Sequence, residues 1–135
     1  MITSMAFTVY PVKEMARARA FYEGVLGLRL SHHFQYDRYE WVEYDLGDST
    51  FAVTTMDMGH PPGAKEAVVG FETTDLDAFV ATLKERSMPF VLDVFATPVC
   101  RMAVIEDPDG NHLVIHKRHS HLQSSPKVRQ GQRTI

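Results

Sequence analysis

The chain has 135 residues, a formal net charge of −3, 44% hydrophobic residues and 23% charged residues. These values are typical of a globular domain. It lacks the apolar run of roughly 18 residues that a membrane-spanning helix needs, and its start, MITSMAFTVYPVK, lacks the basic segment of a secretory signal. The single cysteine, Cys100, excludes an intrachain disulfide and favours a cytoplasmic location. We therefore expect no membrane partner.

The charges are unevenly distributed along the chain. Five of the 14 Lys and Arg residues lie in residues 117–135, which contain no acid, so the rest of the chain carries a balance of −8. An acidic body argues against a nucleic-acid partner. The composition predicts a single domain over residues 1–117, followed by a basic, disordered tail over residues 118–135.

The first strand and helix are predicted in AFTVYPVKEMARARAFYEGVLGL. A β-favouring run reaches Val12, and Glu14 then places a carboxylate near the positive end of the helix dipole. Gly27 is expected to stop the helix. The apolar residues at helical spacing are Met15, Ala18, Phe21, Tyr22 and Val25.

Three strands are expected next, in LRLSHHF, YEWVEYDLG and STFAVTTM, and they complete a first module at about 5–57. A Gly/Pro-rich linker, DMGHPPGAKE, separates it from a second module at about 66–117. That module has a strand, then a helix that is expected to begin with a Thr74–Asp77 capping box and to bury one face. Its last three strands are predicted in FVLDVFA, CRMAVIE and NHLVIHK.

The two halves are related by an offset of 61 residues, which pairs Glu14 with Asp75 and Tyr10 with Phe71. Each half therefore has the order β-α-β-β-β, which indicates an internal repeat and an α+β fold. One such half leaves a sheet face unburied. We expect the two to combine to shelter a core and a cavity.

Three motifs carry a resemblance to a known family: FYEGVLGL (21–28), TTDLDAF (73–79) and DPDGN (107–111). Together they resemble the vicinal oxygen chelate superfamily, which includes glyoxalase I, extradiol dioxygenases, fosfomycin-resistance enzymes and bleomycin-resistance proteins. The resemblance implies two βαβββ modules that form a curved mixed sheet around a central cavity. It also implies a homodimer.

The resemblance further implies where a metal would be bound. Ligands are expected seven residues before each helix start, seven residues after the first Asp of the DPDGN turn, and late in the first module. In this sequence those positions hold Phe7, Val68, Val114, and Ala52 or Val53. None offers a lone pair to a divalent ion. We therefore predict no metal and no cofactor, as in the bleomycin-resistance proteins, which bind a drug without reacting with it.

Histidines follow the DPDGN turn and raise the alternative of a displaced metal site. Because side chains on a strand alternate, His112 and His116 share a face with Val114, as Glu72 does with Val68. Two histidines four residues apart on a strand are roughly 13–14 Å apart, which is too far to share one ion. Glu72 with either histidine is also a candidate acid–base pair.

The cavity is expected to be mainly apolar. Trp41, the only tryptophan, suits either the core or a platform for a planar ligand. Arg101 is expected to pair with Glu106 or another surface acid, or to clamp an anionic ligand. The predicted ligand-binding residues are Phe7, Trp41, Val68, Glu72, Arg101, His112, Val114 and His116.

The sequence thus favours a metal-free protein that binds a small organic molecule containing an aromatic or cationic part. Two enzyme alternatives remain open. One is a metal-independent isomerase or lyase that uses Glu72 with His112 or His116. The other is a glyoxalase- or dioxygenase-like enzyme with displaced metal ligands.

Overall fold

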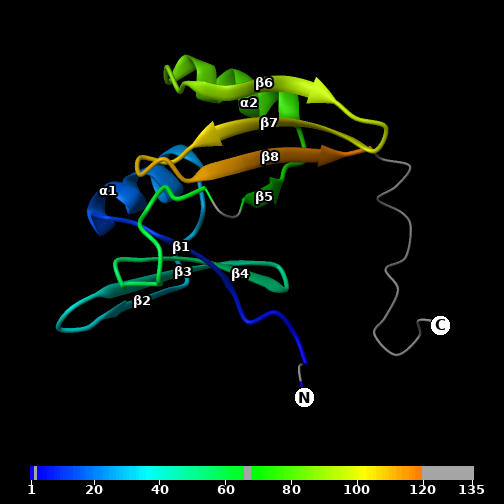
Figure 1. The fold of residues 1–135 in the computed structure, drawn as a ribbon. Helices are drawn as coiled ribbons and strands as arrows, with labels where there is room; N and C mark the ends of the chain where they lie inside the picture. The colour runs from blue at the N-terminus through cyan, green and yellow to red at the C-terminus, as the bar shows by residue number, and fades with distance from the viewer. Residues whose placement is uncertain (2, 66–67, 120–135) are drawn as a thin grey trace.

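The computed structural model describes residues 1, 3–65 and 68–119. The predicted tail beyond residue 119, and the first two residues of the predicted second module, lie outside this range. Figure 1 shows the arrangement of the elements. In chain order they are β1 (Thr8–Pro11), α1 (Met15–Arg19), the π-helix η1 (Ala20–Val25), β2 (His32–Gln35), β3 (Glu40–Leu46), β4 (Ser49–Thr54), β5 (Val69–Glu72), α2 (Leu76–Glu85), β6 (Phe90–Ala96), β7 (Cys100–Glu106) and β8 (His112–Arg118).

The strands form two four-stranded mixed sheets with the same internal order. Sheet 1 is β1-β4-β3-β2 and sheet 2 is β5-β8-β7-β6. In each, the first and last strands of a module pair in parallel, and the remaining pairs are antiparallel. The predicted α+β fold of two βαβββ modules is confirmed, although the sheets do not close on each other. In the described part of the chain, no helix is long and apolar enough to cross a bilayer.

The first helix changes its winding half-way. α1 continues into the π-helix η1, and the chain leaves the helix at Gly27, whose φ of 74° few other residues adopt. The predicted stop at this glycine is confirmed. The helix buries Met15, Ala18, Phe21 and Tyr22, so the apolar spacing in the sequence marks the correct face.

The N-cap of the second helix, α2, lies one residue later than expected. Asp75 is the N-cap, and its side chain accepts a hydrogen bond from the backbone N–H of Ala78 at 3.1 Å. The predicted Thr74–Asp77 capping box is therefore wrong. A carboxylate is an equally good cap and also favours the positive end of the helix dipole. The predicted apolar face is confirmed, with Leu76, Val80 and Leu83 buried.

One core is shared by both modules. Phe51 of sheet 1 meets Phe71 of sheet 2 edge-to-face, with ring centroids 5.2 Å apart, and helix residues such as Tyr22 and Leu83 belong to the same buried cluster. In Figure 1 α1 lies between the levels of the two sheets and α2 lies behind sheet 2. We call the side of each sheet that contacts this core its helix side, and the opposite side its outer face.

The DPDGN turn is bound into this core by its first carboxylate. Asp107 is buried, and its Oδ2 accepts hydrogen bonds from the Tyr22 hydroxyl and the Asn111 side-chain amide, both at 2.8 Å. Its Oδ1 accepts from the backbone N–H groups of Asp109 and Asn111 at 2.9 Å. Burial, and then the nearby charge of Asp107, raises the pKa of Tyr22 well above its usual value.

The same turn joins the second module to the first. The Asn111 amide donates to the carbonyl of Pro11 at 3.1 Å, and its oxygen accepts from the N–H of Gly63 in the linker at 2.9 Å. Asp109 accepts from Arg17 of α1 at 2.8 Å. The acidic side chains of the turn are therefore bonded to the protein itself, and they hold the two modules together.

A substitution at Gly63 tests this junction, because both the backbone conformation and the close approach of Asp109 favour glycine at this position. Its φ is +77°, and a Cβ at this position would lie 2.3 Å from the carbonyl oxygen of Asp109, whereas Gly59, with a φ of +91°, has open space around it. Gly63→Ala is expected to lower the free energy of unfolding by about 1–3 kcal/mol more than Gly59→Ala, because only the first substitution also overpacks the turn. Urea titrations of both variants measure the difference. Equal losses would show that the close approach does not matter.

Candidate functional site

The outer face of sheet 1 carries a group of aromatic side chains. The strand register places Phe34 opposite Trp41 and His32 opposite Glu43. Phe7 meets Trp41 edge-to-face with centroids 5.0 Å apart, and the His32 and Phe34 rings are stacked, 5.8 Å apart and 7° from parallel. Such a surface can receive a flat ring.

Two carboxylates lie beside these rings. Glu43 accepts a hydrogen bond from the Trp41 indole N–H at 2.9 Å and lies 3.5 Å from His32 Nδ1. Asp45, two residues further along β3, accepts from the Thr50 hydroxyl at 2.9 Å. Ligand atoms of His32, Glu43 and Asp45 lie within 4.8 Å of one another. The cluster could hold an organic cation or a divalent ion.

Sequence reasoning did not assign this cluster to the site. The alternation in YEWVEYD places Trp41, Glu43 and Asp45 on one face, so the pattern could have identified both carboxylates. The contribution of His32 depends on the register of β2 with β3, which the alternation within one strand does not specify.

The outer face of sheet 2 holds most of the predicted site residues. The β5–β8 register places Gly70 opposite Val114 and Glu72 opposite His116. His116 Nδ1 lies 2.5 Å from Glu72 Oε1, and the other oxygen of Glu72 accepts from the backbone N–H of Arg118 at 2.8 Å. Glu72 and His116 therefore form a close hydrogen-bonded pair, as one of the enzyme alternatives requires.

His112 takes a different partner. Its Nε2 lies 3.1 Å from Glu106 Oε1, and its backbone carbonyl accepts from the Tyr10 hydroxyl at 2.6 Å. Within the described residues, Glu72, His112 and His116 do not converge as a set of three possible metal ligands. The spacing of the histidines along β8 accounts for this separation.

Arg101 lies away from the other predicted residues. It is opposite Lys117 in the β7–β8 register, on the other side of the sheet from His116, and its guanidinium donates to both oxygens of Asp77 at 2.8 and 3.1 Å. This contact holds the pKa of Asp77 below its usual value. Of the two roles considered for Arg101, the structure contains the ion pair with a surface acid.

The predicted site residues are divided between two faces within one chain. Phe7 and Trp41 lie on the outer face of sheet 1, whereas Val68, Glu72 and Val114 lie on that of sheet 2. Because the helix sides share one core, the outer faces point away from it in different directions. One chain therefore does not bring all these residues to a single cavity.

In this chain, the residues at the positions expected to bind a metal do not suit a metal centre. Phe7, Val68 and Val114 end in hydrocarbon groups, and Val68 is 56% exposed. Ala52 lies opposite Glu43, but its methyl group offers no donor atom, and Val53 is buried in the core. No side chain in this set can ligate a divalent ion.

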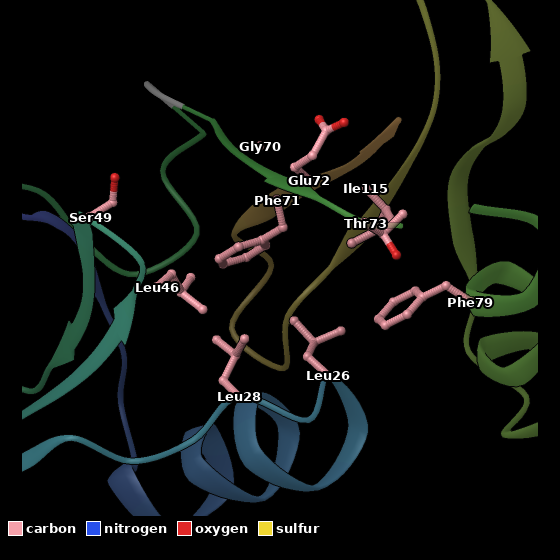
Figure 2. Close-up of a pocket in the computed structure, with 10 residues that line it drawn as sticks. All are labelled: Leu26, Leu28, Leu46, Ser49, Gly70, Phe71, Glu72, Thr73, Phe79 and Ile115. Carbon is pink, nitrogen blue, oxygen red and sulfur yellow. The ribbon is translucent and has the colours of Figure 1, made fainter. Parts of the chain in front are cut away.

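A separate pocket of about 340 Å³ lies on the helix side, between the two modules. Figure 2 shows that its apolar side chains come from several elements, and that the Glu72 carboxylate points away from them. It is lined by Leu26, Leu28, Leu46, Ser49, Gly70, Phe71, Glu72, Thr73, Phe79 and Ile115. Sequence reasoning predicted a cavity between the modules but did not identify these lining residues, because their meeting depends on how the modules are joined.

The chain thus has two βαβββ modules, and hydrocarbon side chains stand at the positions where a metal ligand is expected. It is a two-module protein that lacks the expected metal ligands. Residues 4–115 match the model of the Glyoxalase/Bleomycin resistance protein/Dioxygenase superfamily. The chain belongs to this family, which the sequence motifs had indicated. No curated protein matches the chain.

Solved structures give the same fold. TnmS3, described as an antibiotic binding protein from Streptomyces sp. CB03234, is 25% identical with a TM-score of 0.77, over 87% of this chain and 98% of its own. A glyoxalase/bleomycin resistance protein from the same organism is 28% identical with a TM-score of 0.71, over 86% and 100%. A superfamily member from Sphaerobacter thermophilus DSM 20745 is 23% identical with a TM-score of 0.70, over 86% and 98%, and shows the fold alone.

Proposed function

We propose that this protein binds a small organic molecule on its outer faces, without a metal and without converting it. The observation that carries the proposal is the outer face of sheet 1, where a group of aromatic side chains surrounds a position that is expected to hold a metal ligand in relatives. Phe7 stands at a position where relatives are expected to bind an ion, and it contacts Trp41 instead. The likeness to an antibiotic-binding protein supports the same role.

The side chains around Trp41 favour a planar ligand that carries a positive charge. Rings such as Trp41 and Phe34 offer faces and edges to a flat aromatic system, and a cation near them gains from their π-electrons. Glu43 and Asp45 lie on the same face, and no Lys or Arg forms an ion pair with either of them within the described residues. His32 is the one basic side chain in the described part of the chain that pairs with either carboxylate, and the negative charge of the two acids attracts a cation and repels an anion.

A homodimer would complete the ligand site. Large apolar side chains on both outer faces are exposed, including Phe34 at 41% and Leu92 at 52%, and exposed apolar surface of this kind marks contact sites. If the outer face of sheet 2 of one copy lies over sheet 1 of its partner, the ligand is enclosed between Trp41 and residues such as Val114. We also propose a cytoplasmic location, on the basis of the single cysteine in the sequence.

The 2.5 Å contact between Glu72 and His116 supports a second candidate, a metal-independent acid–base enzyme. A carboxylate hydrogen-bonded to an imidazole can move a proton to or from a bound substrate. In the single chain, however, the Glu72 side chain is 47% exposed. The exclusion of water that such chemistry needs would have to come from the second copy.

The ligand proposal is tested with a matched pair of probes, 9-aminoacridine, which is cationic at neutral pH, and acridine, which is neutral. By calorimetry, Trp41→Ala is expected to weaken both by about tenfold, because it removes the platform. Glu43→Gln is expected to weaken the cation by about fivefold and acridine by less than about twofold.

Two controls accompany this experiment. His33→Ala alters the histidine next to His32. His33 pairs with Glu40 at 2.8 Å and lies opposite Val42, on the other side of the sheet from Trp41, so the substitution should leave both affinities unchanged. EDTA should also have no effect. Binding that disappears with EDTA, or that is indifferent to Trp41→Ala, would contradict the proposal.

The dimer is tested by analytical ultracentrifugation. The wild-type chain is expected to sediment at twice its monomer mass. Leu92→Asp should give a monomer, because a charge at a buried contact is costly. Met56→Asp places the same charge at a residue that is 40% exposed in the loop after β4, and it should leave the dimer intact. A monomeric wild-type protein would refute the shared site.

A binder and an enzyme differ in what becomes of the ligand. A compound found by thermal-shift screening is expected to be recovered chemically unchanged, by mass spectrometry, after long incubation with the protein. Conversion that is lost in Glu72→Gln, with ligand affinity retained, would instead establish the acid–base enzyme. Gln keeps the size and hydrogen-bonding capacity of Glu but cannot carry the proton.

A further inference from the structure

The pocket between the modules is formed by the end of the first helix. In η1 the backbone N–H of Leu26 bonds to the carbonyl of Phe21 at 3.0 Å, five residues back, and that of Leu28 bonds to Tyr22 at 2.9 Å. Gly27 lies between the two leucines with a positive φ of 74°. This turn directs both Leu26 and Leu28 to the pocket (Figure 2). Single π-helical turns occur frequently at functional sites.

The other walls come from both sheets and from α2. Phe71 and Ile115 project from the helix side of sheet 2, Phe79 from α2, and Leu46 from the end of β3 in sheet 1. Figure 2 shows these side chains arranged around a common space. Leu46 is 38% exposed, and Phe71 and Phe79 are only partly buried. An occupant would therefore remove apolar surface of both modules from water.

The polar groups of the pocket are few and neutral. Ser49 and Thr73, which carry hydroxyl groups, are among the residues that line it. Glu72 contributes to the wall, but its carboxylate is directed away from the apolar side chains (Figure 2) and is bonded to His116 on the outer face. Burying an ion here would leave its charge without a partner, which is strongly unfavourable.

We propose that this pocket is a second binding site, for a compact neutral molecule of one or two rings that carries at most one hydroxyl or N–H group. Its volume of about 340 Å³ exceeds the apolar cavity of about 150 Å³ that suffices for benzene. The hydrocarbon lining selects a neutral, apolar guest. Ser49 or Thr73 accepts or donates the single hydrogen bond.

This site is distinct from the ligand site proposed on the outer faces. Ile115 and Val114 are neighbours on β8 and point to opposite sides of the sheet, as do Phe71 and Glu72 on β5. The inner site also needs no second copy of the chain, because all its walls belong to one chain. The two sites can therefore be observed separately.

The test uses indole as the probe and the methyl groups of the full-length protein as the reporters in ¹H–¹³C NMR. Indole is expected to shift the methyl signals of Leu26, Leu28, Leu46 and Ile115, and to give nuclear Overhauser contacts to them. The signals of Val68 and Val114 on the outer face should remain in place. The signals of Val68 and Val114 are in turn expected to shift with 9-aminoacridine. The experiment therefore reports on the two proposed sites independently.

Leu46→Phe fills the pocket from its exposed edge and is expected to weaken indole binding at least about tenfold. Leu28→Phe fills it from another side and serves if the first variant folds poorly. Met56→Phe adds the same ring outside the pocket and should leave the affinity within about twofold. Indole shifts centred on Val68 and Val114, or unchanged affinity in both filling variants, would overturn the proposal.

Discussion

The architecture depends on the buried carboxylate of Asp107. It lies at the point where the last strand turns back, and it accepts hydrogen bonds from the Tyr22 hydroxyl, from Asn111 and from the backbone of its own turn. A hydrogen bond to a buried charged group contributes about 1.5–3 kcal/mol, and a buried charge without such partners costs more than that. The position of the second module therefore depends on the hydrogen bond from Tyr22, in the first helix, to Asp107.

This contact determines which surfaces remain for function. Because Asp107 and Asn111 hold the helix sides of the two sheets together, most of those sides are buried in the shared core, apart from the pocket between the modules. The other accessible surfaces are the two outer faces, with exposed side chains such as Phe7 on one and Val68 on the other. Apolar side chains on these faces are exposed to water, and contact with a second copy or a ligand would bury them favourably.

The sequence predicts those parts of the molecule whose causes are local. The helix face that buries Phe21 and the helix stop at Gly27 follow from spacing and from backbone freedom, and the repeat follows from the matching order of the elements. The ion pair of Arg101 with a surface acid was one of the two predicted roles, but the identity of its partner, Asp77, and the separate directions of the two outer faces were beyond such reasoning, because both depend on how sheets and helices meet. Asp75 rather than Thr74 caps α2 for a similar reason: both are good caps, and only the path of the chain chooses between them.

The separation of faces also explains how one fold can host a metal centre in some proteins and an organic ligand in others. Phe7, Val68 and Val114 stand at positions that contribute nothing to the Asp107 junction or to the shared core. Donor groups there can be exchanged for hydrocarbon without loss of the contacts that hold the fold. The change does alter the local chemistry, since hydrocarbon favours a flat organic guest and disfavours an ion. The pocket beside Phe71 is constrained differently, because residues that line it also pack in the core. A substitution that changes the shape of this pocket would therefore also change the packing between the two modules.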